Sequence, residues 1–158
     1  MGLSNIFTLQ GLLSLLYSLP AILIALSFHE FAHAWAANKM GDPTAKNLGR
    51  LTLDPIKHLD LVGTICLILF RFGWAKPVPI NPRNFRKPVR GEILVSLAGV
   101  AMNFLVSFVA AAVLYIFYGS VITVVDVPSI IIFYIMMLNI YFGIFNLIPI
   151  PPLDGHHL

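Results

Sequence analysis

Long apolar stretches separated by short polar segments dominate the sequence. Three of these stretches, 11–38, 92–118 and 128–149, are long enough for a membrane-spanning helix, which needs about 20 residues. A fourth stretch, 59–70, has only about a dozen residues, which is short for a full crossing and fits a re-entrant or buried segment. Glycine and proline residues follow the first and last stretches and are expected to end those helices.

The composition also indicates a membrane protein. Of the 158 residues, 58 % are apolar and 11 % are charged, and the mean hydropathy is +0.87. Soluble domains carry about 25 % charged residues, so a soluble monomer is excluded. An intrinsically disordered chain is excluded as well, because such chains are polar. The length fits one domain over 1–158, and the one cysteine, Cys66, excludes an internal disulfide framework.

The basic residues give the chain an orientation. All ten lie between Lys39 and Arg90, in the two segments 39–58 and 71–90. The positive-inside rule places both segments in the cytoplasm, which requires 59–70 between them to re-enter rather than cross. No basic face repeats along a helix, so nucleic acid is not an expected partner. The expected location is the cell (plasma) membrane, as a multi-pass protein in a lipid bilayer with its basic loops cytoplasmic.

The first apolar stretch contains His29-Glu30-Phe31-Ala32-His33. Residues four apart share a helix face, so both imidazoles can reach one metal ion, and neutral imidazole suits zinc. Glu30 can take a proton from a metal-activated water without binding the metal. Each ionisable side chain at membrane depth costs at least ~2.5–3.5 kcal/mol, and metal coordination compensates for that cost. A solvated interfacial pair of histidines is the alternative, but the neighbouring residues are mostly apolar.

A catalytic zinc site needs a third protein ligand. The candidates are Asp154, His156, His157 and His58, and Asp154 is the strongest. It follows the proline-rich segment 146–153, whose irregular backbone is tolerated at membrane depth only where it is buried or lines a wet cavity. An ordinary interfacial turn is the other interpretation of Asp154.

Three motifs resemble the site-two protease family of intramembrane zinc metalloproteases: 29–33, 96–103 and 146–155. Val100 departs from the family pattern, which has proline after the glycine corresponding to Gly99. The resemblance implies zinc as the cofactor and the following residue roles: His29, His33 and Asp154 as metal ligands, Glu30 as the general base, Asn146 beside the substrate, and Asn103 in packing or substrate support.

The resemblance also implies the fold. We expect an α-helical integral membrane protein with three to four membrane segments and a small membrane-associated β element. The β element is expected from 50–53 and 74–80, and one of these segments could pair with an unwound substrate. Family members normally continue beyond the Asp-Gly pair, which favours a C-terminally truncated core.

The predicted function is zinc-dependent hydrolysis of peptide bonds in membrane-spanning protein substrates, known as regulated intramembrane proteolysis. Glu30 would move the proton, and the amide of Asn146 would donate to the developing oxyanion. The alternative is a non-catalytic membrane protein that binds or transports metal. Transporters often contain internal repeats, and none is visible here. Transport also gives no special reason for a glutamate beside the first histidine.

Overall fold

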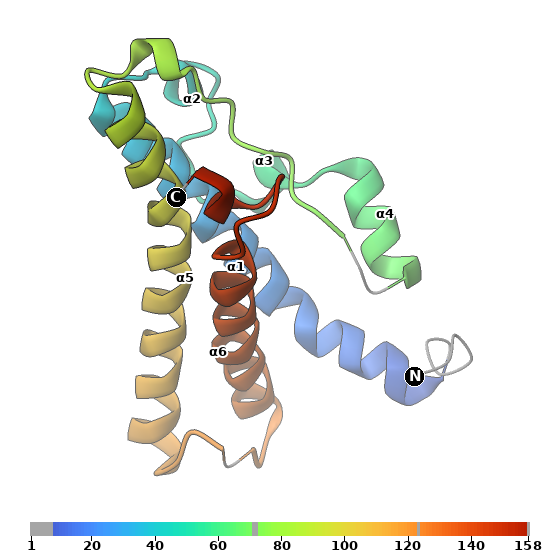
Figure 1. The fold of residues 1–158 in the computed structure, drawn as a ribbon. Helices are drawn as coiled ribbons and strands as arrows, with labels where there is room; N and C mark the ends of the chain where they lie inside the picture. Colours follow the sequence, from blue (N-terminus) through green and yellow to red (C-terminus); the bar gives the residue numbers. More distant parts are fainter. Residues whose placement is uncertain (1–7, 71–72, 123, 158) are drawn as a thin grey trace.

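Three long helices form the body of the protein (Figure 1). The computed structural model describes residues 8–70, 73–122 and 124–157. Its helices α1 (Leu9–Met40), α5 (Pro88–Tyr118) and α6 (Val127–Asn146) are each long and apolar enough to cross a membrane. Each packs against the other two. The three predicted spans are therefore confirmed as helices of sufficient length and hydropathy.

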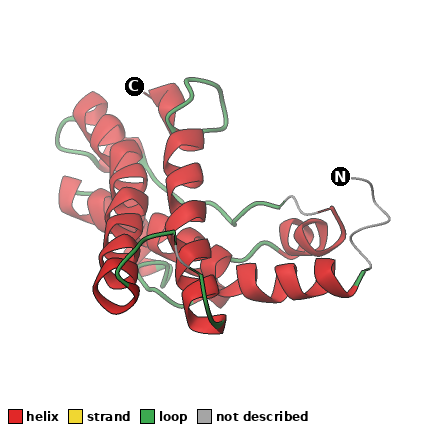
Figure 2. Cartoon of the chain, turned by 90° about the horizontal axis from the view of Figure 1, so that it is seen from below, coloured by secondary structure: helices red, strands yellow, loops and turns green. Residues whose placement is uncertain are grey.

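The remaining elements are short. Between α1 and α5 lie α2 (Thr44–Asn47), α3 (Pro55–His58), α4 (Leu61–Phe70) and η2 (Pro82–Asn84), and η3 (Asp154–His157) follows α6. Helix α4 has only 10 residues, so its length is too small for a crossing, as the sequence predicted. Figures 1 and 2 both show α4 on the side of the N-terminal part of α1, away from α5.

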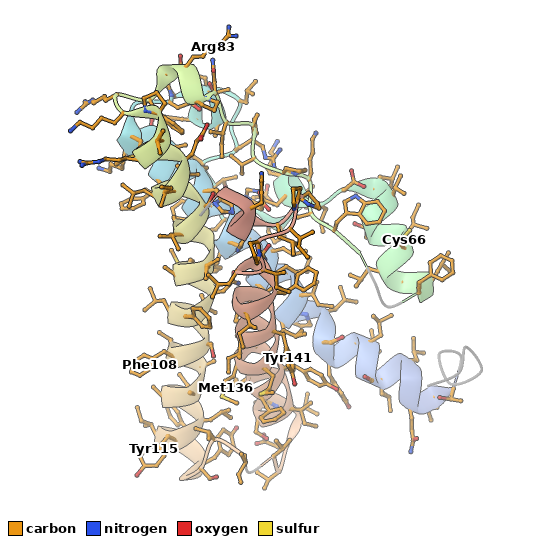
Figure 3. The ribbon with its side chains drawn as sticks, in the orientation of Figure 1. Cys66, Arg83, Phe108, Tyr115, Met136 and Tyr141 are labelled. Atoms are coloured by element: carbon orange, nitrogen blue, oxygen red, sulfur yellow. The ribbon has the colours of Figure 1, made fainter. Side chains whose placement is uncertain are left out.

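The outer face of the bundle is apolar. Phe108 and Tyr115 point away from the bundle on α5 and are 72 % and 66 % exposed, whereas Met136 of α6 is 7 % exposed and packs with Ala110 and Leu114 of α5 (Figure 3). Large apolar side chains on the outside are expected where the surrounding medium is lipid. The three apolar helices thus indicate a membrane protein.

The predicted β element is not supported. Among the described residues no strand is assigned, and the one β contact is an isolated antiparallel bridge between Leu59 and Ala75. The segment 74–80 is extended, as expected, but no second strand lies along it, and 51–52 forms a bend.

Beside the bridge, the Lys76 N–H donates to the His58 carbonyl at 2.8 Å, and side chains provide further hydrogen bonds to the extended segment. The Arg50 guanidinium donates to the Lys76 carbonyl at 2.6 Å, and the Val78 N–H donates to Oε2 of Glu30 at 3.0 Å. Two prolines in the segment have no N–H with which to continue a ladder. The Val78 hydrogen bond thus holds the segment against α1, which carries Glu30.

A buried carboxylate joins the end of α1 to the segment before α5. Helix α1 ends at Gly41, whose φ of 113° gives the left-handed C-cap. The next residue, Asp42, is 0 % exposed and accepts hydrogen bonds from Asn81 N–H at 2.7 Å, Asn84 Nδ2 at 2.8 Å and Thr44 N–H at 3.1 Å. Burial of Asp42 opposes its ionisation, but these hydrogen bonds outweigh burial and hold the pKa of its carboxyl below its ordinary value.

Candidate metal centre

Three potential ligand atoms converge inside the helical bundle. His29 and His33 lie one turn apart on α1, and Asp154 begins η3 after α6. The two Nε2 atoms are 2.9 Å apart, and Oδ2 of Asp154 lies 3.1 Å from that of His29 and 3.2 Å from that of His33. The histidines are 5 % and 6 % exposed. These three residues thus form a compact group that could hold a metal ion.

The hydrogen bonds behind the rings determine which ring nitrogens carry protons. Nδ1 of His33 lies 2.8 Å from the carbonyl oxygen of Val95. Because a carbonyl oxygen can only accept, this Nδ1 carries the hydrogen. In the neutral imidazole, Nε2 of His33 is then a bare acceptor directed at the other two ligand atoms.

The same result holds for His29 through a relay of two asparagines. Asn139 Nδ2 donates to the Ile135 carbonyl at 2.8 Å, so its Oδ1 faces Asn103 and accepts from Asn103 Nδ2 at 2.8 Å. Asn103 Nδ2 also donates to the Ala25 carbonyl at 3.3 Å, which leaves Oδ1 of Asn103 to accept from Nδ1 of His29 at 2.6 Å. This orientation makes Nε2 of neutral His29 an acceptor as well.

The converging atoms are consequently three acceptors with no donor among them. Oδ2 of Asp154 is buried and has no hydrogen-bond partner. Such an arrangement is costly unless a cation lies between the atoms. Zinc ligands at about 2.0–2.2 Å in a tetrahedron are separated from one another by about 3.3–3.6 Å, so a small outward shift of these side chains would admit the ion. The observed separations of 2.9–3.2 Å are close to those values, so the residues fit zinc with three protein ligands.

Glycine at position 99 lets α5 approach the two rings. A Cβ added to Gly99 would lie 2.6 Å from Nε2 of His33 and 2.7 Å from Cε1 of His29. Real Cβ contacts are essentially never this short. Any larger residue on this face of α5 would displace the imidazoles from their present positions.

A tight turn after α6 brings Asp154 to the histidines. A Cβ at Gly155 would lie 2.4 Å from the carbonyl oxygen of Leu147 and 2.6 Å from that of Ile148. Only glycine allows the chain to fold back this closely on the residues that follow α6. The turn also brings η3 into contact with α5.

The chain is similar to proteins that are named as zinc metalloproteases. The chain is 42 % identical over 146 residues to "Putative zinc metalloprotease YwhC" of Bacillus subtilis, covering 90 % of this chain and 67 % of that protein. The protein belongs to this zinc metalloprotease family. It is 30 % identical over 143 residues to "Putative zinc metalloprotease Rip2" of Mycolicibacterium smegmatis, of which it spans 52 %. No family model and no solved structure matches the chain.

Membership of this metalloprotease family implies zinc. Glu30 follows His29 on α1. Its side chain is buried on α1, 8 % exposed, and its Oε2 accepts the Val78 N–H at 3.0 Å. Glu30 is not one of the three converging ligands. The Val78 N–H therefore orients the Glu30 carboxylate, which lies outside the group of three potential ligands.

The two predicted asparagines, Asn103 and Asn146, lie in different surroundings. Asn103 is 0 % exposed behind His29, where it orients the ring and cannot reach a substrate without rearrangement. Asn146 is half-buried at the end of α6, and its Nδ2 donates to the Phe142 carbonyl at 3.0 Å.

Neither His58 nor His156 joins the group. His58 is 1 % exposed, and its ring nitrogens lie 2.8 Å from the Thr52 carbonyl and 3.5 Å from Arg50 Nη2. The ring of His58 is therefore buried, and it ties the 52–58 segment together. His156 is exposed, and its Nδ1 donates to the Leu153 carbonyl. The side chain of His157 lies outside the described residues.

Sequence reasoning missed three features of the site: Asn139, the Val78 N–H, and the space that Gly99 leaves for the rings. Only Asn139 carried a usable signal. A buried amide in an apolar helix needs a partner, and Asn103 and Asn139 are the two fully buried asparagines of the described residues. Pairing them would have identified the contact behind His29.

Proposed function

We propose that this protein is an intramembrane zinc metalloprotease of the site-two type that hydrolyses peptide bonds of membrane-spanning protein substrates. One observation carries the proposal. Two imidazoles and a carboxylate converge within 3.2 Å of one another, beside Glu30, among helices long and apolar enough to span a membrane. Hydrolysis in lipid needs such a group, since a peptide bond there has no free access to water.

In this proposal His29, His33 and Asp154 hold zinc, and the Asn103–Asn139 relay and the Val95 carbonyl orient the two rings. When bound, zinc supplies Lewis-acid chemistry and lowers the pKa of a water toward 7. The Glu30 carboxylate, anchored by Val78, takes the proton of the attacking water and passes it to the leaving nitrogen.

Asn146 supplies the remaining polar group. Its amide now donates to the Phe142 carbonyl one turn earlier. On substrate binding we propose that the amide turns to the developing oxyanion, where a positioned donor contributes about 2.7–4 kcal/mol. The substrate helix must unwind locally, because its own turns shield its peptide bonds.

The orientation proposed from the charges is compatible with this chemistry. The basic residues of the described part of the chain run from Lys39, in the last turn of α1, to Arg90, in the first turn of α5, and so flank the end of the bundle where these two helices are connected. We propose that this end is cytoplasmic, in the plasma membrane, and that water reaches Glu30 from that side.

The test combines metal analysis with cleavage of transmembrane peptides. Purified protein in detergent should contain about one zinc per chain, and a chelator should abolish cleavage. Glu30→Gln should retain zinc and lose at least about a hundredfold in cleavage rate, because a general base contributes about 10²–10⁴. His29→Ala should lose zinc itself. Glu92→Gln removes a carboxylate from α5 outside the ligand group and should cleave normally.

Two outcomes would overturn the proposal. Cleavage by Glu30→Gln at the parental rate would remove the general base. Stoichiometric zinc with no cleavage of any transmembrane peptide would instead favour the alternative, a membrane protein that binds or transports metal.

A further inference from the structure

A second candidate site lies where the end of α1 meets the start of α5, among the exposed side chains of basic residues. The N–H of Arg86 donates to the carbonyl of Met40 at 3.2 Å, which brings the two segments together. Between them is a cavity of about 230 Å³ lined by Lys39, Met40, Arg86, Lys87, Arg90 and Leu94. Figure 3 shows nitrogen-tipped side chains gathered at this end of the molecule. We refer to this feature as the basic cavity.

The basic cavity has a strong excess of positive charge. Four of its six lining residues are basic and none is acidic. Among the residues that the structure describes, the ion pairs are those of Asp154 with His29 and His33, so no carboxylate neutralises these four cations. Lys39 Nζ lies 5.8 Å from the centre of the Trp35 ring, which is the one cation–π contact among the described residues.

The start of α5 adds to this charge. The N-cap residue Lys87 makes no side-chain hydrogen bond, and Pro88 follows it. A helix that begins without an acidic cap presents its partial positive charge to whatever lies before it. The cavity therefore suits an anion on two grounds, four unneutralised side chains and an uncapped helix start.

The position of the basic cavity along α5 indicates which class of anion it binds. Leu94 lies at the beginning of a stretch of α5, from 93 to 118, that contains no charged residue. Arg90, one turn earlier, thus stands at the level where the apolar part of a spanning helix gives way to water. Met40 and Leu94 line the same cavity as the cations, so an occupant meets apolar and basic atoms together.

We propose that the basic cavity binds an anionic phospholipid, with the headgroup phosphate between Arg86, Lys87 and Arg90 and the first methylenes of the lipid against Leu94 and Met40. Arginine is suited to phosphate because its guanidinium donates two parallel hydrogen bonds. Basic pockets between spanning helices are sites of this type for anionic headgroups. The proposal does not depend on the proposed hydrolysis.

Binding there would act on the helix that carries the metal ligands. Lys39 lies on α1 less than two turns after His33. A lipid held between Lys39 and Arg90 would clamp the end of α1 against α5. Since a ligand that binds only the folded state stabilises it, anionic lipid should raise the melting temperature of the protein.

The experiment measures lipid retention by native mass spectrometry. Full-length protein is purified in neutral detergent and titrated with phosphatidylglycerol or phosphatidylcholine. The parent should retain phosphatidylglycerol at least about tenfold more strongly, and the double variant Arg86→Gln, Arg90→Gln should lose that preference. The matched control is Lys46→Gln, Arg83→Gln, which removes the same charge from two exposed residues outside the cavity and should keep the preference.

A third variant separates lipid from free phosphate. Leu94→Ser should weaken retention of phosphatidylglycerol while leaving the effect of inorganic phosphate on the melting temperature unchanged. Zinc content, which the variants should not change, verifies that each still folds.

Two results would overturn the proposal. Equal loss of preference in the two double variants would indicate a general basic field rather than this cavity. Competition by millimolar inorganic phosphate that displaces the lipid completely, with Leu94→Ser behaving like the parent, would make the cavity a site for a free anion. Neither result would bear on Glu30 or on cleavage, so failure here is distinguishable from failure of the proposed function.

Discussion

The two halves of α1 have the same secondary structure but opposite surroundings. Every buried residue of α1 follows Pro20, and many of them are alanines that let α5 and α6 approach closely. Before Pro20 the helix carries leucines that are exposed, with Leu9 at 73 % and Leu16 at 53 %. The half with small residues carries His29, Glu30 and His33. The two histidines and the glutamate therefore lie in the half of α1 whose small side chains allow α5 and α6 to pack closely around it.

The largest effect is expected from filling the space beside the ligands. Gly99→Ala would place a methyl group 2.6 Å from the His33 ring, so the imidazoles must move and the three acceptors separate. We expect the purified variant to retain no zinc after dialysis. Gly143→Ala is the matched control, because its Cβ meets only the Phe104 ring, at 3.0–3.3 Å, and it should keep zinc. Full zinc occupancy in Gly99→Ala would contradict the role assigned to this glycine.

The next effect tests the relay behind His29. Asn139→Ala removes the nearer of the two acceptors of Asn103 Nδ2 and leaves only the Ala25 carbonyl at 3.3 Å, so Asn103 holds the His29 ring less firmly in one orientation. Loss of such a supporting partner costs about 10–100-fold in metal affinity. Competition titration with a chromogenic chelator measures the affinity.

Asn146→Ala is the control for that measurement, because the Asn146 amide bonds within its own helix. Its zinc affinity should equal the parent value, whereas cleavage should fall. Unchanged zinc affinity in both variants would mean that Asn139 fills space and orients nothing.

The contrast between these features also explains what the sequence could predict. The three spans depend on local hydropathy, and the His29–His33 pair depends on the helical repeat, so both are readable along the chain. The Asn103–Asn139 contact joins two helices whose relative rotation no local pattern specifies. The extended 74–80 segment looked like a strand, but its partners are the side chains of Arg50 and Glu30, which local propensity cannot reveal.

A smaller effect is expected at Asp42, which joins the end of α1 to the segment before α5. Asp42→Asn replaces an acceptor of several N–H groups with an amide, and should destabilise the fold by about 1–3 kcal/mol at neutral pH. The folded pKa of Asp42 is lowered, so its contribution is present above the unfolded pKa of about 3.9 and is lost as pH falls below that value.

The difference in melting temperature between parent and Asp42→Asn should therefore be large at pH 6 and shrink toward pH 3. Comparing the two proteins at each pH cancels the titration of other carboxylates. A difference that stays constant over this range would show that hydrogen bonding to the ionised carboxylate is not what Asp42 contributes.

The smallest effect tests the two halves of α1 directly. Leu26, 7 % exposed, should cost about 2 kcal/mol when changed to alanine, because it leaves a cavity among packed helices. Leu16, 53 % exposed, should change stability by less than about 0.5 kcal/mol, since about half of its surface is already exposed in the folded protein. Thermal unfolding in the same detergent compares the two variants. An equal loss of stability in both variants would mean that the N-terminal half of α1 is covered in the folded protein. Burial would then not distinguish the half that carries His29, Glu30 and His33 from the half before Pro20.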